Sequence, residues 1–134
     1  MILLDTHAWI RWLHPELGQS LPPQLRYWLE NADAVFAISV ISCLEVAQLI
    51  KKGRLWLPLP LPQWYEAALG DSDIITLPLS PNLLFASTQL PDIHHDPADR
   101  IIIATAQAYD AYLITKDEDI QKYPNLRTLW KTVP

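Results

Sequence analysis

The chain has 134 residues, of which 50% are hydrophobic, and a formal net charge of −5. This length suffices for one compact domain, expected to span residues 1–134, and is too short for two. The negative charge excludes a broad basic surface that binds nucleic acid through its phosphates alone. It does not exclude a nuclease, because acids gathered at one site account for negative charge and bind divalent cations.

The first residues run directly into the apolar Met-Ile-Leu-Leu, and the longest apolar stretch is too short to cross a bilayer. We therefore expect a cytoplasmic protein without a basic leader segment and without a membrane as partner. The single cysteine, Cys43, excludes an internal disulfide and fits a reducing compartment.

Apolar runs and amphipathic segments alternate along the chain. In order, the pattern predicts a strand at 2–4, helices at 7–13 and 23–31, a strand at 34–40 and a helix at 42–52. An extended proline-rich connector at 57–62 leads to a helix at 62–69, a strand at 74–77 and helices at 81–90 and 97–110. Strands at 112–115 and 128–130 complete the chain, the last at an edge of the sheet. The alternation predicts an α/β fold with a mostly parallel sheet.

Four carboxylates stand near the ends of predicted strands or the starts of predicted helices. Asp5 follows the first strand and Asp117 the fourth, while Glu45 and Asp99 fall in the first turns of helices. Functional groups of parallel sheets collect at the carboxyl ends of the strands, so these four acids are expected to converge. Clustered carboxylates repel one another and need a cation, and their hard oxygens favour Mg²⁺ or Mn²⁺ over zinc. Such a site suits phosphodiester hydrolysis. For each acid taken alone, capping a helix is an equally good explanation.

The phrases around these acids resemble those of PIN-domain nucleases, and of the VapC toxins of bacterial toxin–antitoxin pairs among them. They are MILLDTHA around Asp5, ISCLEVA around Glu45, HHDPADR around Asp99 and TKD ending at Asp117. The resemblance implies a three-layer α/β/α sandwich and Mg²⁺- or Mn²⁺-dependent endoribonuclease activity, with the four acids as catalytic metal ligands. It also implies a cognate antitoxin and a homodimer. Two departures are His95 and Ala98, where similar sequences carry arginine and phenylalanine. A PIN-like module that binds RNA or a partner protein without cutting remains the alternative.

Several neighbouring residues are candidates for supporting roles. Asp96, before Pro97, is predicted to cap the following helix, with metal ligation as the alternative. Thr6 and Thr115 are candidates for hydrogen bonds that orient a carboxylate, although plain strand-end threonines explain them equally well.

The basic residues Arg100, Lys116 and Arg54 are predicted to contact RNA phosphates, against the alternatives of solvated surface charge and, for Arg100, a structural ion pair. The roles of His94 and His95 stay open. A zinc site is disfavoured because adjacent residues of an extended stretch cannot easily bind one ion, and a metal-free mechanism using His7 and His94 leaves the acids without a purpose. The RNA target is not specified by the sequence.

Overall fold

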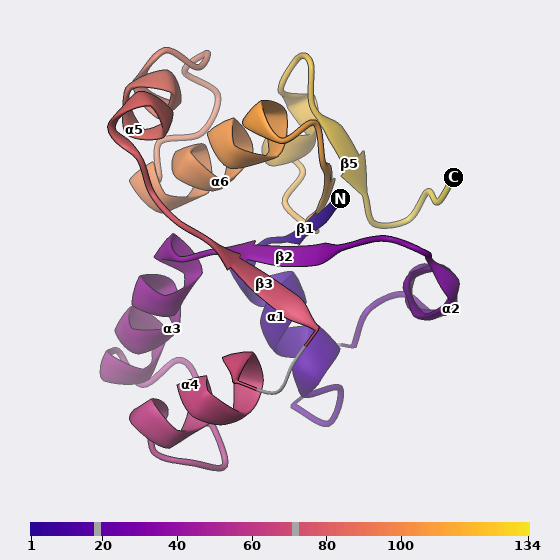
Figure 1. Ribbon diagram of the computed structural model, residues 1–134, viewed down its shortest axis with the longest axis vertical. Coiled ribbons are helices and arrows are strands. Elements are labelled where there is room, and N and C mark those ends of the chain that lie inside the picture. Colours follow the sequence, from indigo (N-terminus) through magenta and orange to yellow (C-terminus); the bar gives the residue numbers. More distant parts are fainter. Residues whose placement is uncertain (18–19, 71–72) are drawn as a thin grey trace.

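A computed structural model describes residues 1–17, 20–70 and 73–134. Its centre is a sheet of five strands in the order β3-β2-β1-β4-β5 (Figure 1). Every neighbouring pair in this sheet is parallel, which confirms the predicted α/β class. The strands are β1 (Ile2–Leu4), β2 (Phe36–Ser39), β3 (Ile74–Leu77), β4 (Tyr112–Ile114) and β5 (Arg127–Leu129).

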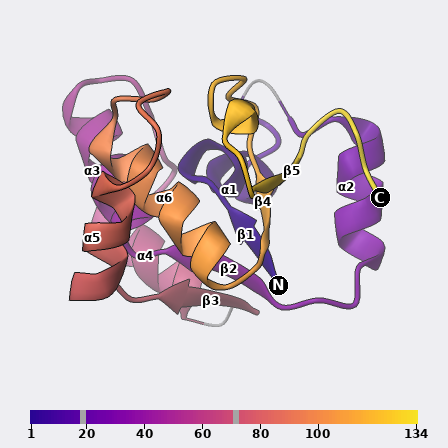
Figure 2. The same cartoon turned by 90° about the horizontal axis from the view of Figure 1, so that it is seen from above.

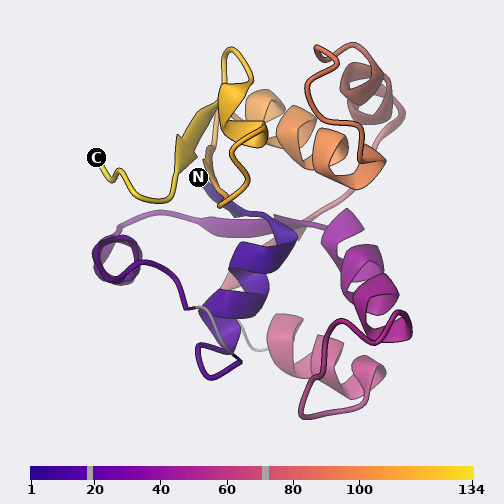
Figure 3. The same ribbon diagram turned by 180° about the vertical axis from the view of Figure 1, so that it is seen from behind.

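Helices cover both faces of the sheet, which confirms the predicted three-layer α/β/α sandwich (Figures 1 and 2). The helices are α1 (Thr6–Leu13), α2 (Pro23–Asn31), α3 (Ile41–Lys51), α4 (Leu61–Leu69), α5 (Pro81–Thr88), α6 (Pro97–Ala108) and the short 3₁₀ turn η1 (Ile120–Lys122). Helices α1 to α4 lie on one face, and α5 and α6 pack together on the other (Figure 3). Within the described residues, no helix has the length and apolar character needed to cross a membrane.

Two hydrophobic cores separate the layers, and the alternation of side chains along β1 explains why. Ile2 and Leu4 point into the core beneath α1 to α4, whereas Leu3 points into the core beneath α6. All three are at most 1% exposed. A strand buried on both faces is a continuous apolar run, which is how Ile2–Leu4 is recognised in the sequence.

The strand order contains one reversal. Strands β2 and β3 follow β1 on one side of it, whereas β4 and β5 lie on the other side of β1. Because crossovers between parallel strands are right-handed, this reversal also moves the helices to the opposite face. The carboxyl ends of β1 and β4 therefore lie side by side at the point where ligands of open parallel sheets bind.

Local signals set the helix boundaries. Asp5 caps α1 by accepting the Ala8 N–H at 2.8 Å, so this helix starts one residue earlier than predicted. Ser80 caps α5 by accepting the Leu83 N–H at 3.1 Å, and Asp96 caps α6 as predicted. β2 begins at Phe36, two residues later than the predicted strand.

The end of α3 is closed by a left-handed glycine. Gly53 has a φ of +70°, and its N–H donates to the Ile50 carbonyl at 3.0 Å. The next N–H, of Arg54, donates to the Leu49 carbonyl at 2.9 Å. This pattern is a Schellman motif, for which glycine is preferred because it lacks a Cβ. It fixes the backbone of Arg54 beside the last turn of α3.

The tryptophans largely serve packing. Trp9 is fully buried and meets Trp64 edge to face, with ring centroids 5.0 Å apart. Trp12 stacks on Phe36 at the margin of the same core. Trp56 differs, because 71% of it is exposed at the proline-rich connector.

Candidate active site

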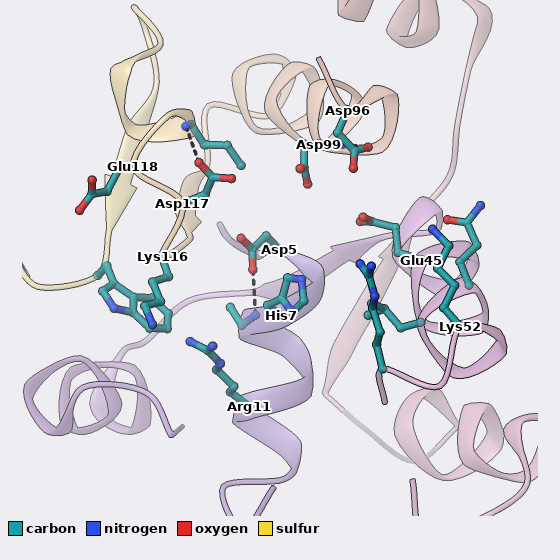
Figure 4. A pocket seen from close by; sticks show the side chains of 16 residues that line it. Asp5, His7, Arg11, Glu45, Lys52, Asp96, Asp99, Lys116, Asp117 and Glu118 are labelled. Carbon is teal, nitrogen blue, oxygen red and sulfur yellow. Dashed lines mark hydrogen bonds between the residues drawn. The ribbon is translucent and has the colours of Figure 1, made fainter. Parts of the chain in front are cut away.

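The four predicted acids line one cavity of about 590 Å³ at the carboxyl ends of β1 and β4. Asp5 lies between Asp117 and Glu45, and the Asp99 carboxylate faces it from α6 (Figure 4). The acids come from the N-cap of α1, from α3, from the first turn of α6 and from the segment after β4. The fold thus gathers carboxylates from four separate parts of the chain.

Asp5 is the most buried of these acids, with 6% of its surface exposed. Burial raises its pKa, while hydrogen bonds from the Thr115 hydroxyl and the Ala8 N–H lower it in part. Thr115 also accepts the Asp117 N–H at 3.1 Å. One fully buried threonine therefore ties the acid after β1 to the backbone after β4.

Glu45 is oriented by hydroxyl groups. The Thr6 hydroxyl donates to Glu45 Oε1 at 2.5 Å, and the Thr6 and Ser42 oxygens lie 2.9 Å apart. Burial raises the pKa of Glu45, and the charges of Asp96 and Asp5 raise it further, against the effect of the Thr6 hydrogen bond. Because α3 begins at Ile41, Glu45 falls in its second turn instead of the predicted first turn.

The carboxyl group of Asp99 is strongly perturbed. Burial, followed by the charges of Glu45 and Asp96, raises its pKa from an ordinary 3.8 to about 7. Asp96 itself caps α6 through the N–H groups of Ala98 and Asp99, at 2.9 and 3.4 Å. The cap turns the Asp96 carboxylate toward the backbone, as expected, and also places a second negative charge near Asp99.

Asp117 is held by backbone and side-chain donors. Its Oδ1 accepts the N–H groups of Asp119 and Ile120 at 2.8 and 3.2 Å. Its Oδ2 lies 3.0 Å from His94 Nε2, which is also 3.2 Å from Asp99 Oδ2. Potential ligand atoms of His94, Asp99 and Asp117 all lie within 4.8 Å of one another.

This donor set fits a hard divalent cation. Burial raises the pKa values of Asp5, Glu45 and Asp99, and the charges of neighbouring acids raise those of Glu45 and Asp99 further, so a bound cation would favour the charged form of each carboxyl. Carboxylate oxygens are the ligands that Mg²⁺ and Mn²⁺ prefer. The residues present therefore fit a divalent cation held by carboxylates.

The basic residues predicted to contact RNA separate into two groups. Lys116 and Arg54 line the cavity with the acids. Arg100 lines a neighbouring cavity of about 380 Å³ with His95. Its guanidinium donates to the carbonyls of Leu90, Pro91 and His94 at 2.9 to 3.0 Å. The structure therefore gives Arg100 internal partners of the kind expected from a structural role, and its phosphate contact stays a prediction.

Two further cations, Arg11 and Lys52, line the same cavity. Arg11 lies in α1 with its guanidinium 5.5 Å from the ring centroid of Trp130, and Lys52 follows α3 (Figure 4). The signal for Arg11 was the helical spacing that puts residues 7 and 11 on one face of α1. His7 lies at the same cavity. The signal for Lys52 is the basic run that it forms with Lys51 and Arg54, although solvated surface charge is the better explanation for a lysine at a helix end.

Comparisons with known proteins place the chain in a family. The PIN domain model matches residues 2–126. Ribonuclease VapC22 of Mycobacterium tuberculosis is 30% identical over 132 residues, covering 96% of this chain and 98% of the relative.

Solved structures show the same fold. FitAcB from Neisseria gonorrhoeae superposes with a TM-score of 0.66 at 22% identity, over 96% of both chains. VapBC2 from Rickettsia felis, bound to a DNA fragment from its promoter, gives a TM-score of 0.66 at 19% identity, over 97% of this chain and 99% of that one. From its sequence match, its fold and the acids at the reversal of its sheet, the chain belongs to the PIN-domain family and resembles the VapC ribonucleases within it.

Proposed function

We propose that this protein is a divalent-cation-dependent endoribonuclease, the toxin of a toxin–antitoxin pair, built as a single domain over residues 1–134. The observation that carries the proposal is the convergence of Asp5, Glu45, Asp99 and Asp117 on one cavity. The likeness to a ribonuclease of the VapC group supports the reaction class. Mg²⁺ or Mn²⁺ is the proposed cofactor, because the donors are carboxylate oxygens.

Asp5, Glu45, Asp99 and Asp117 would hold the cation. A bound cation would neutralise the negative charge that develops at the scissile phosphate, and it would polarise the groups around that phosphate. The remaining chemistry falls to the chain. Thr6 and Thr115 keep Glu45 and Asp5 in fixed rotamers. Burial and neighbouring acids raise the pKa of Asp99 to about 7, and a bound cation would favour the charged form of this carboxyl.

The substrate is proposed to approach along the cationic wall of the cavity. Arg11, Lys52, Arg54 and Lys116 lie at the same cavity as the acids. A phosphodiester backbone can pair with these cations while one of its phosphates reaches the carboxylates. The net charge of −5 is compatible with RNA binding because the cations are local to the site.

Two protein partners belong to the same proposal. An inhibitory antitoxin is proposed because structures of similar fold include a toxin–antitoxin complex from Klebsiella pneumoniae. A homodimer is supported by exposed apolar side chains on α5, where Leu84 and Phe85 are 40% and 66% exposed. RNA and a protein antitoxin as partners imply action in the cytoplasm. Sedimentation of the purified chain tests the dimer.

The decisive experiment is cleavage of total RNA by the purified chain. We expect fragments with Mg²⁺ or Mn²⁺ and none with a chelator. Asp5→Asn and Asp99→Asn should abolish cleavage, because each removes a charged ligand. Asp33→Asn is the matched control, since it makes the same change at an exposed position before β2, and it should retain activity.

Three results would contradict the proposal. Cleavage that persists in chelator would exclude the metal mechanism. Cleavage that survives both substitutions at the acids would point to a contaminating nuclease or another site. Tight RNA binding without cleavage in every RNA pool would instead favour a binding module that keeps the PIN fold.

A further inference from the structure

His94 lies between two of the proposed metal ligands. Its Nε2 is 3.0 Å from Asp117 Oδ2 and 3.2 Å from Asp99 Oδ2. The imidazole comes from the segment between α5 and α6, so it links the first turn of α6 to the segment after β4. A histidine in this place is either a further metal ligand or a hydrogen-bond donor to the ligands. The other ring nitrogen distinguishes these two roles.

The position of the ring hydrogen follows from the hydrogen bonds. His94 Nδ1 lies 3.1 Å from the backbone nitrogen of Asp96, whose N–H points at it. A backbone N–H can only donate, so Nδ1 is the acceptor in this contact. A ring whose Nδ1 accepts carries its hydrogen on Nε2. The Nε2–H group is therefore the one that faces Asp99 and Asp117.

We propose that His94 is a positioning residue of the metal centre and not one of its ligands: its Nε2–H donates to Oδ2 of Asp117, and Oδ2 of Asp99 lies 3.2 Å from the same nitrogen. Ligation would need a lone pair on Nε2, which this tautomer does not offer. Donation to the carboxylates is what groups behind metal ligands commonly do, orienting the ligands and tuning their basicity. The inference rests on the proposed metal-dependent function and assigns a role within it.

The segment that carries His94 is itself fixed on both sides. The His94 N–H donates to Tyr123 Oη at 2.8 Å, and Tyr123 is only 3% exposed. The His94 carbonyl accepts from Arg100 Nη1 at 3.0 Å, and the same guanidinium holds the carbonyls of Leu90 and Pro91. Arg100 on α6 thereby acts on the site through His94. These contacts explain why a loop residue can place its imidazole reproducibly between two acids.

The tautomer can be tested directly by ¹⁵N NMR of histidine-labelled wild-type protein. We expect the His94 ring to carry its hydrogen on Nε2 without metal and to keep it there when Mg²⁺ is added. A hydrogen on Nδ1 in the metal-free protein would overturn the donor assignment. Loss of the Nε2 hydrogen on adding Mg²⁺ would show ligation and would also overturn the proposal. Both readings use the wild-type chain and do not depend on any variant folding.

The effect on metal binding can be measured by titration with Mn²⁺, followed by electron paramagnetic resonance. His94→Ala removes the donor and should weaken Mn²⁺ binding by about 10- to 100-fold, the range found when groups behind metal ligands are removed. His94→Gln places an amide N–H near the position of Nε2 and should restore most of the affinity. Unchanged affinity in His94→Ala would overturn the proposal, as would equal losses in both variants.

His95→Ala is the matched control, because His95 is the exposed neighbour in the same segment and should leave Mn²⁺ affinity unchanged. We expect the resonance spectrum of Mn²⁺ bound to the wild type to show no coupling to the nitrogen of His94. A nitrogen coupling present in the wild type and absent in His94→Ala would contradict this. Such a coupling would identify His94 as a ligand. Failure of the wild type to bind Mn²⁺ or Mg²⁺ at all would refute the proposed function itself, whereas the tautomer of the metal-free ring would still report on the donor assignment.

Discussion

Removing the charge of Asp99 should stabilise the metal-free protein, and more so at higher pH. The Asp99 carboxyl has a pKa raised from 3.8 to about 7, first by burial and then by Glu45 and Asp96. Its side chain is 21% exposed, so solvent screens the penalty only in part. Asp99→Asn keeps the size of the side chain and removes the charge.

Proton linkage predicts that the free energy of unfolding of the wild type falls as the pH rises. Below about pH 4 the carboxyl is protonated in both states, and it contributes no penalty. As the pH rises, the unfolded chain releases this proton before the folded chain does, so the free energy of unfolding falls until about pH 7. At about 1.4 kcal/mol per pKa unit, the change from 3.8 to about 7 corresponds to about 4 kcal/mol.

Most of this penalty lies in an accessible pH range. About 3 kcal/mol of it falls between pH 5 and pH 7. Because neighbouring acids share the same repulsion and the site is partly solvated, we expect about 2 kcal/mol. The stability of Asp99→Asn relative to wild type should therefore increase by about 2 kcal/mol between pH 5 and pH 8.

Urea unfolding followed by tryptophan fluorescence, in chelator at pH 5 and pH 8, measures this difference. Taking the difference between variant and wild type cancels the titration of groups that both chains share, and Asp33→Asn controls for loss of an exposed charge. Saturating Mn²⁺ should stabilise the wild type at pH 8 by mass action and leave Asp99→Asn nearly unchanged. A difference between the chains that is the same at both pH values would refute the reasoning.

Three further perturbations follow from the contacts described above. Gly53→Ala should lower the free energy of unfolding by about 1 kcal/mol in urea titrations, because a φ of +70° is strained for alanine. No atom lies within 4 Å of the added Cβ, so the loss would come from the backbone and not from a clash. An unchanged unfolding midpoint would contradict this strain. Ser80→Ala should cost about 1 kcal/mol through loss of the α5 cap, with Ser80→Thr as the conservative control. Arg54→Ala should weaken RNA binding similarly for all sequences and reduce the salt slope by about 0.7, measured by fluorescence anisotropy; a change in sequence preference alone would argue for base contacts.

Many of the strands and helix starts could be predicted from local sequence signals. Ile2–Leu4 is an uninterrupted apolar run because it is buried on both faces. Ser80 before Pro81 and Asp96 before Pro97 mark helix starts because hydroxyl and carboxylate oxygens accept the free N–H groups of a first turn. The errors are at boundaries, as at β2 and Glu45, where pairing and packing decide which terminal residues join an element.

Long-range placement belongs to the tertiary structure. The sequence identified Asp5 and Asp117 as strand-end acids, but their proximity depends on β4 inserting beside β1 instead of extending the sheet at β3. The pKa of Asp99 depends in the same way on burial and on Glu45 from another helix. Arg100 and His94 illustrate the limit most clearly. The sequence predicted a phosphate contact or a structural ion pair for Arg100 and left the role of His94 open, while their polar partners in the structure come from the loop, Asp96 and the acids. Helix and strand propensity and hydrophobic patterning depend on residues a few positions apart, so they can be predicted from one sequence. Charge coupling and hydrogen bonding between distant residues depend on distances that exist only once the chain has folded.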